Sequence, residues 1–362
     1  MNKIKNDLNF ELKIIVAGMH LSEEFGYSIN DILKDGFKID EKVEMNPEKD
    51  TELAMAQSIG KGIIGMSKAL DKIKPDLLIV LGDRIEALSG VITAAYMNIA
   101  IGHIHGGDST RAGLDESARH AITKFSHIHF TVTEKSYKRV EKMGEDKWRI
   151  FNVGAPCLDT ILNINYTRRE EIVDSFKLKK EKPYIVLLQH SVSTEPKKAE
   201  SQIIETLEAI KKINIQTVAI YPNSDAGGRG IIKQLKKYEK YGFLKSYKNL
   251  PQKKYLSLLK YASILVGNSS SGIIESSSFK LPVVNIGIRQ DGRQRADNVI
   301  DVEHDRIKIK KAIEKGLYNK EFRRIVEKSK NPYGAGSSSK KIVKILNQLE
   351  ITDKLLQKKI SY

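Results

Sequence analysis

The sequence is nearly without cysteine. Cys157 is the single cysteine among 362 residues, so no disulfide framework can form within the chain. A metal site built from several thiolates of this chain is excluded for the same reason. Because chains with so little cysteine are typical of reducing compartments, we expect a cytoplasmic protein.

Long hydrophobic runs are lacking as well. No stretch approaches the roughly 18 apolar residues of a membrane-spanning helix, and residues 1–11 have no apolar segment of the signal-peptide kind. Apolar residues still make up 40% of the chain and charged residues 29%, which is typical of a globular protein and not of a disordered one. We therefore expect no membrane partner and, at about 150 residues per domain, two domains.

Positive charge is in excess, with 61 Lys and Arg against 45 Asp and Glu and a net charge of +16. Such a balance raises the question of nucleic-acid binding. The lysines are spread through helical-looking stretches (177–182, 233–240 and 306–315) and interleaved with acids. Because no zinc-finger or RNA-recognition motif accompanies them, we expect a solvated surface and no nucleic-acid partner. Polyanion binding is the alternative, and a steeply salt-dependent gel shift would support it.

Short apolar runs alternate with amphipathic stretches along most of the chain. Runs rich in Ile and Val without strict polar alternation are typical of parallel strands buried on both faces. Helical patterns such as 52–73 and 116–126 separate them. The runs are 12–18, 76–83, 98–107, 127–132 and 149–156, and then 184–190, 217–223, 243–247, 263–270 and 281–287. This rhythm predicts the α/β class, with two doubly wound, Rossmann-like domains and a ligand cleft between them.

The rhythm pauses at a polar connector over 157–182, which divides the chain. We predict an N-terminal domain over residues 1–165 and a C-terminal domain over 166–340. A lysine-rich helix over 341–362 completes the chain and can pack back on the N-terminal domain.

Four carboxylates follow strand ends in the first half. Asp83 ends one strand, Asp108 follows the next, and Asp115 and Glu116 open the helix after it. Ligands of open α/β sheets bind at the carboxyl ends of the strands. An isolated helix cap needs one acid, so four acids together predict an edge that exchanges protons with a substrate. A helix N-cap remains the structural alternative for Asp83.

His103 and His105 are two residues apart, which places them on one face of a strand with Asp108 close behind. This spacing leaves a metal site as a rival interpretation. No third ligand at a suitable spacing supports it, so we expect no metal. A core histidine bonded to the backbone is a further alternative for at least one of the two.

The second half carries a strand followed by Gly-Asn-Ser-Ser-Ser-Gly over 267–272. Small residues such as Ser269 and Ser270 leave N–H groups and hydroxyls free for an anion, which favours a diphosphate cradle without a Walker lysine. Glu275 can accept hydrogen bonds from ribose hydroxyls, and Arg289 follows the next strand, where a guanidinium can pair with phosphate. A simple helix cap and a surface arginine are the alternatives.

Two more loops follow strands of the second half. His190 stands at a strand end, where an imidazole can transfer a proton or donate to a pyrophosphate. Asn223 and Asp225 follow another strand. Because Asn-x-Asp is also a common turn sequence, a structural role stays open for this pair.

Taken in order, these blocks resemble the hydrolysing UDP-N-acetylglucosamine 2-epimerases of sialic and legionaminic acid synthesis. The similarity runs from about Leu12 to about Asn298. It rests on GMHLSEEFG (18–26), GDRIEALSG (82–90), HIHGGD (103–108), LDESARHAITKFSHIHF (114–130), NVGAP (152–156), YPNSDAGGR (221–229), GNSSSGIIE (267–275) and NIGIRQDGR (285–293). The resemblance implies a GT-B architecture with the active site between the domains. It also implies a UDP-sugar substrate, no metal or other cofactor, and a homodimer or homotetramer.

The resemblance also assigns roles to residues. The implied catalytic positions are Asp83, His105, Asp108, Asp115, Glu116 and His190. The implied substrate-binding positions are His20, Arg84, Asn223, Asp225, Ser269, Ser270, Glu275 and Arg289.

The implied reaction is an anti elimination of UDP that gives 2-acetamidoglucal, after which water adds and N-acetylmannosamine leaves. UDP-N,N′-diacetylbacillosamine is the alternative substrate. A glycosyltransferase of the same fold and a non-catalytic UDP-sugar-binding protein are the alternatives of another class.

Two features depart from the pattern of the family. His105 stands where many relatives have a glutamate in His-Ile-Glu-Gly-Gly, so either the imidazole or the neighbouring Asp108 is expected to do that work. Relatives also begin with a strand and a Gly-Thr-Arg loop, whereas residues 1–21 resemble the helix and second strand that come after it. We expect this first strand to be lacking, Met1 to be an internal methionine, and the chain to be poorly soluble or to bind UDP-sugar weakly for that reason.

Overall fold

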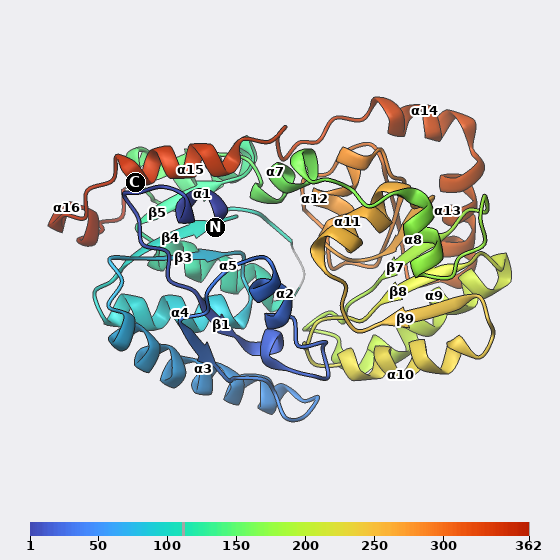
Figure 1. Cartoon of the computed structure of the whole chain (residues 1–362), viewed down its shortest axis with the longest axis horizontal. Coiled ribbons are helices and arrows are strands. Elements are labelled where there is room, and N and C mark those ends of the chain that lie inside the picture. Colours follow the sequence, from blue (N-terminus) through green and yellow to red (C-terminus); the bar gives the residue numbers. More distant parts are fainter. Residues whose placement is uncertain (111–112, 362) are drawn as a thin grey trace.

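The computed structural model describes residues 1–110 and 113–361 and shows two α/β domains side by side (Figure 1). The N-terminal domain holds a sheet of order β3-β4-β5-β6 and a separate pair β1-β2. The C-terminal domain holds one sheet of order β12-β11-β10-β7-β8-β9. Every strand pair in the described residues is parallel, which confirms two Rossmann-like domains.

The elements of the N-terminal domain alternate as strands and helices. Its strands are β1 (Ile15–Ala17), β2 (Glu41–Val43), β3 (Leu77–Leu81), β4 (Ala100–Ile104), β5 (Ile128–Thr131) and β6 (Ile150–Asn152). Its helices are α1 (Asn2–Lys5), α2 (Ile29–Lys34), α3 (Glu52–Ile73), α4 (Ile85–Tyr96), α5 (Leu114–Phe125), α6 (Glu134–Lys142) and α7 (Pro156–Asn163).

The C-terminal domain repeats the alternation. Its strands are β7 (Ile185–Leu188), β8 (Thr217–Ile220), β9 (Leu244–Tyr247), β10 (Ile264–Gly267), β11 (Val283–Ile286) and β12 (Val299–Val302). Its helices are α8 (Arg169–Ser175), α9 (Ala199–Ile213), α10 (Gly228–Glu239), α11 (Gln252–Tyr261), α12 (Ser271–Ile274), α13 (Arg306–Tyr318) and α14 (Lys320–Lys328). The chain ends with α15 (Ser338–Asn347) and α16 (Asp353–Leu356).

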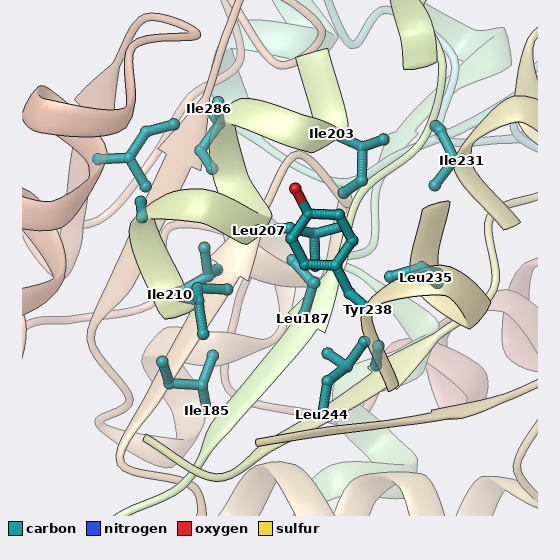
Figure 2. Packing of buried hydrophobic residues seen from close by; sticks show 14 of the residues in the cluster. Ile185, Leu187, Ile203, Leu207, Ile210, Ile231, Leu235, Tyr238, Leu244 and Ile286 are labelled. Atoms are coloured by element: carbon teal, nitrogen blue, oxygen red, sulfur yellow. The ribbon is translucent and has the colours of Figure 1, made fainter. Parts of the chain in front are cut away.

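The central strands of the C-terminal sheet are buried at every position of β7, β10 and β11. Helices cover both faces of this sheet, so continuous apolar runs, not alternating ones, are what the strands need. Leu187 of β7 packs with Leu207 and Ile210 of α9 and with Leu235 of α10 (Figure 2). This core fixes where the loops after the strands emerge.

The N-terminal strands are divided between two sheets. Within the described residues β1 pairs with β2 alone and β3 pairs with β4 alone. Helix α3 bridges the division, because it packs against both β2 and α4. Leu81 at the end of β3 is 58% exposed, whereas four of the five residues of β4 are buried. Each of β1 and β3 therefore presents one backbone edge without a strand beside it.

Local signals fix the long helix α3 as the sequence predicts. The hydroxyl of Thr51 accepts a hydrogen bond from the Ala54 N–H at 3.2 Å, which is an N-cap. Lys74 ends the helix with a left-handed φ of 50°. No helix in the described part of the chain is long and apolar enough to cross a membrane.

The C-terminal stretch forms two helices where the sequence favoured one. The chain leaves α15 after Asn347, and Thr352 is extended with φ −114° and ψ 166° before α16 begins. The neighbouring β-branched residues Ile351 and Thr352 favour this extended break over a continuous helix.

Both C-terminal helices lie on the N-terminal domain (Figure 1). The guanidinium of Arg149 donates to the carbonyls of Lys354 and Leu355, both at 2.8 Å. The ammonium of Lys358 donates to the Ser126 carbonyl at 2.7 Å and pairs with buried Glu145 at 2.8 Å. Because Ser126 follows the last residue of α5, the tail holds the far end of the helix whose first turn carries Asp115 and Glu116.

Candidate active site

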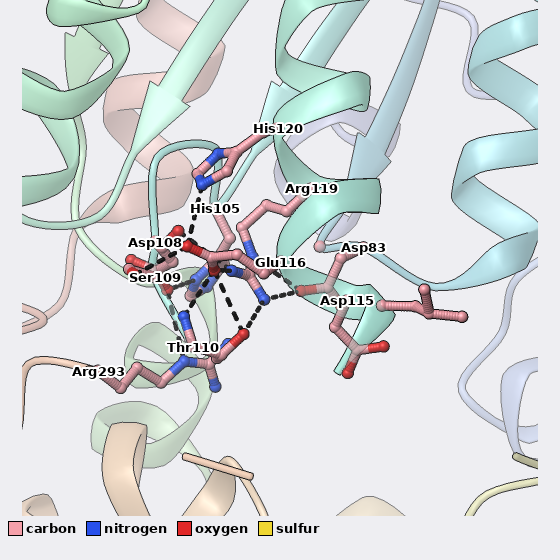
Figure 3. A network of polar contacts seen from close by, with 12 residues as sticks. Asp83, His105, Asp108, Ser109, Thr110, Asp115, Glu116, Arg119, His120 and Arg293 are labelled. Atoms are coloured by element: carbon pink, nitrogen blue, oxygen red, sulfur yellow. Dashed lines mark hydrogen bonds and ion pairs between the residues drawn. The ribbon is translucent and has the colours of Figure 1, made fainter. Parts of the chain in front are cut away.

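Four predicted acids gather at one edge of the N-terminal sheet (Figure 3). Asp83 follows β3, Asp108 lies in the loop after β4, and Asp115 and Glu116 occupy the first turn of α5. The structure therefore brings together the carboxylates that follow neighbouring strands, as parallel strands require.

Arg119 joins three of these segments from the second turn of α5. Its side chain is 1% exposed. Nε lies 2.8 Å from Asp83 Oδ2, and Nη1 lies 2.8 Å from Glu116 Oε2 and 3.1 Å from the Asp108 carbonyl. Asp83 is thus half of a charge-assisted pair, and it does not cap α4, whose N-cap position is Arg84. The sequence analysis gave Arg119 no role, although its position one turn after Asp115 on the same helix was a signal.

Glu116 is bonded within its own loop. Its carboxylate accepts from the Thr110 N–H at 2.7 Å, the Ser109 hydroxyl at 2.9 Å and His120 Nε2 at 3.1 Å. Burial alone would raise the pKa of Glu116, but these donors and Arg119 outweigh it and hold that pKa well below its usual range. The contacts make Glu116 a permanent anion that shapes the loop.

His105 and Asp108 are bonded to each other. His105 Nδ1 lies 3.2 Å from Asp108 Oδ2, and the Ser136 hydroxyl donates to Asp108 Oδ1 at 2.7 Å. Burial favours the neutral acid, but the hydrogen bond and charge of His105 lead the contacts that hold the pKa of Asp108 well below its usual range. The imidazole of His105 and the carboxylate of Asp108 were alternatives for the proton transfer. In the structure the two groups are bonded to each other, and Ser136 orients Asp108.

His103 does not share the setting of His105. The strand ends at Ile104, and His105 has a left-handed φ of 70°, so the two rings do not continue one strand face. His103 Nε2 donates to the Gly82 carbonyl at 2.8 Å, and burial lowers its pKa to about 3. Among the described residues, no three His, Cys, Asp or Glu side chains are grouped to hold a metal ion.

His190 is one of the candidate anion-binding residues of the C-terminal domain. Its Nδ1 accepts from the Asn223 backbone N–H at 3.1 Å, so the ring proton resides on Nε2. Burial, with the charge of Arg289, holds the pKa of His190 far below its ordinary value. The imidazole is therefore a neutral N–H donor. Asn268, which the sequence analysis did not single out, fixes the His190 backbone from both sides, at 2.7 and 2.9 Å.

Glu275 follows the Ser269–Ser270 turn in the chain and is partly buried. Its Oε2 has no hydrogen-bond partner in the described part of the chain, and burial raises its pKa to about 7. Helix α12 is only four residues long, so Glu275 follows its last residue and does not stand one turn inside a longer helix. An unpartnered carboxyl of this kind is suited to a ligand that brings its own donors.

Two ion pairs join the domains at the site. Arg84 Nη1 lies 2.5 Å from Asp225 Oδ1, and Arg289 Nη2 lies 3.6 Å from Asp115 Oδ2. The Leu114 N–H also donates to the Ser193 hydroxyl across the domains at 2.8 Å. Both arginines and both aspartates were predicted site residues, and these contacts place them between the two sheets.

His20 stands apart from this network. It lies in a short 3-10 helix over Gly18–Leu21 after β1, is exposed, and bonds the Ser28 hydroxyl at 2.7 Å. No contact with the acids accompanies it in the residues that the structure describes. Its role stays a prediction.

Comparison with known proteins places the chain among nucleotide-sugar enzymes. Residues 2–347 match the family profile described as UDP-N-acetylglucosamine 2-epimerase. A Legionella pneumophila protein named UDP-N,N′-diacetylbacillosamine 2-epimerase (hydrolyzing) is 34% identical over 100% of this chain and 94% of its own length. A Campylobacter jejuni protein named GDP/UDP-N,N′-diacetylbacillosamine 2-epimerase (hydrolyzing) is 35% identical over 89% of this chain and 84% of its own length.

The fold has a solved counterpart. The Neisseria meningitidis UDP-GlcNAc 2-epimerase bound to UDP-GlcNAc superimposes with a TM-score of 0.80, at 19% identity, over 96% of this chain and 95% of that one. At this identity the likeness concerns the fold. The profile match and the two relatives that span most of the chain show that it belongs to the UDP-N-acetylglucosamine 2-epimerase family.

Proposed function

We propose that the chain is a hydrolysing 2-epimerase that converts UDP-GlcNAc and water to N-acetylmannosamine and UDP. The observation that carries the proposal is the Asp115–Arg289 pair, in which an edge of carboxylates meets an edge of anion donors across two domains. An elimination of UDP needs both at once, because a base must remove a proton while cations and N–H groups receive the leaving charge.

The C-terminal edge is suited to the nucleotide. Arg289 and the Nε2–H of His190 can donate to the diphosphate, beside the hydroxyls of Ser269 and Ser270. Glu275 can accept from the ribose hydroxyls through its unpartnered oxygen. Asp225 holds Arg84 in place, and the Asn223 N–H holds the ring of His190.

The N-terminal edge is suited to the sugar. A carboxylate takes the C2 proton, the C2–H electron pair forms the C1=C2 double bond, and the C1–O bond breaks with its electrons on UDP. Water then adds hydroxide to C1 and a proton to C2 of the glucal, which gives the 2-epimer. Asp83, Asp115 and the His105–Asp108 pair are the groups that we assign to these proton transfers, while Arg119 and Glu116 position them.

UDP-N,N′-diacetylbacillosamine is a second candidate substrate, and the names of the Legionella and Campylobacter relatives favour it. The two substrates share the nucleotide and the 2-acetamido group, so the same edges serve both. They differ at sugar C4 and C6.

Incubation with each UDP-sugar, followed by phosphorus and proton NMR, tests the proposal. We expect UDP to appear together with a free 2-epimerised sugar, because water completes the reaction. Formation of a UDP-linked 2-epimer without free UDP would contradict hydrolysis. Tight UDP binding with neither product would favour a binding protein instead.

Asp83→Asn removes the charge that Arg119 holds beside the sugar edge. We expect turnover to fall by about two orders of magnitude, the usual scale for a lost acid or base, with UDP affinity nearly unchanged. Asp76→Asn is the matched control, since Asp76 is exposed and precedes the opposite end of β3. Steady-state kinetics and UDP titration check both variants, and full turnover in Asp83→Asn would refute this role.

The raised pKa of Glu275 predicts a pH dependence of nucleotide binding. Its folded pKa is about 7, and only the ionised carboxylate can accept two ribose hydroxyls, so binding releases a proton. UDP affinity should therefore rise with pH through about 7 and level off above it. Glu275→Gln should lose this rise and, above it, bind UDP roughly 10- to 150-fold more weakly, which corresponds to about 1.5–3 kcal/mol.

Calorimetric titration of wild type and Glu275→Gln over this pH range checks the prediction. The ionisation of UDP itself is common to both proteins, so the difference between the two curves isolates Glu275. Parallel curves would show that Glu275 does not contact the nucleotide.

A further inference from the structure

Arg289 lies near the Asp115 carboxylate and is also the proposed cation for the diphosphate. Its Nη2 lies 3.6 Å from Asp115 Oδ2, while Nη1 donates to the Asn268 carbonyl at 3.3 Å. The side chain of Arg289 is 14% exposed and that of Asp115 34% exposed. The proposed function also makes Arg289 the cation for the diphosphate. Because Nη1 already serves the Asn268 carbonyl, the substrate and Asp115 compete for the remaining N–H groups of Arg289.

Asp83 and Glu116 do not compete with the substrate for a cation. Arg119, in the interior of the N-terminal domain, holds Asp83 and Glu116 through 2.8 Å contacts. Arg119 makes no contact with Asp115 in the described residues. Asp83 and Glu116 therefore keep their cation whether or not a nucleotide is present, whereas Asp115 depends on the opposite domain.

The charges that face Asp115 come from three loops, the first of which carries both Asp83 and Arg84. Asp83 follows β3, Arg84 precedes α4, Asp225 follows β8 and Arg289 follows β11. Arg84 is itself engaged by Asp225 at 2.5 Å. Burial and then the charge of Asp83 raise the pKa of Asp115, and Arg289 is the first group that opposes them.

A small pocket, about 100 Å³, opens at the acid edge and is lined by Asp108, Arg139 and Arg293. A larger depression, about 600 Å³, lies against α10, and none of its lining residues belongs to the acid edge. A charged substrate that binds between the domains meets the ion pairs that join them.

We propose that the diphosphate of the UDP-sugar takes Arg289 away from Asp115, and that the released carboxylate of Asp115 removes the C2 proton. This inference rests on the proposed function. The C2–H electron pair moves into the C1=C2 bond, and the C1–O electrons leave with UDP, whose growing charge Arg289 now holds.

The exchange couples binding to chemistry. Loss of a neighbouring cation and arrival of a diphosphate both favour the protonated form of a carboxylate, so Asp115 becomes a stronger base when substrate is bound. Once Asp115 is protonated it is neutral and no longer attracts Arg289, so the cation stays with the leaving group. The proton transfer and the departure of UDP thereby support each other.

Proton counting with UDP alone tests the exchange without turnover. Calorimetric titrations in two buffers of different ionisation enthalpy give the number of protons exchanged on binding. Because burial and the charge of Asp83 raise the pKa of Asp115, wild type should take up more protons than Asp115→Asn in titrations run from acidic to neutral pH. Asp76→Asn should match wild type, because its exposed carboxylate lies away from the site.

Arg289→Gln provides the second arm. In this variant Asp115 has no guanidinium to lose when UDP binds. The difference in proton uptake between Arg289→Gln and the Arg289→Gln/Asp115→Asn double variant should therefore be smaller than the difference between wild type and Asp115→Asn. Equal proton counts in wild type and Asp115→Asn would overturn the exchange while leaving the UDP site intact. Absence of UDP binding to wild type would instead overturn the proposed function, and the exchange with it.

The pH profiles of kcat and kcat/KM give a further test, because a purely structural role of Asp115 would not shift them relative to each other. The acidic limb of kcat reports the substrate complex and that of kcat/KM the free enzyme. In wild type we expect the kcat limb at higher pH than the kcat/KM limb. In Arg289→Gln we expect the two limbs to lie closer together. Coincident limbs in wild type would contradict the exchange.

Discussion

Arg119 carries a positive charge into the interior of the N-terminal domain, where Asp83 and Glu116 each place a carboxylate against it. Without that cation, like charges would face one another in a poorly solvated loop cluster. Breaking a buried pair of this kind typically costs about 3–5 kcal/mol. The same guanidinium bonds the Asp108 carbonyl, so the loops after β3 and β4 and the start of α5 hold one geometry.

Two further ion pairs of the site lie between the domains. The Arg84–Asp225 and Arg289–Asp115 pairs each join a residue of one domain to a residue of the other. A substrate that carries phosphate groups can replace such pairs with its own charges. Helix α5 links this exchangeable layer to the fixed one, since its first turn carries Asp115 and its end is held by Lys358 from the C-terminal tail. A rigid acid edge that faces a replaceable cation is what an elimination of UDP requires.

Much of this arrangement could be predicted from sequence, because the signals are local. The Ile- and Val-rich runs predicted the parallel strands, the amphipathic pattern over 52–73 predicted α3, and residues that follow strands had to meet at one edge. What escaped prediction depends on packing. Arg119 contacts Asp83 from 36 positions away. The left-handed turn at His105 arises from how the loop after β4 meets neighbouring segments.

The central claim is that carboxylates of this edge remove the C2 proton of a UDP-sugar as UDP leaves. Running the reaction in deuterium oxide and examining the released sugar by NMR tests it most directly. The account predicts one deuterium at C2 of every released 2-epimer, because water replaces the proton that the carboxylate removed. A released 2-epimer that retains its original C2 proton would contradict it.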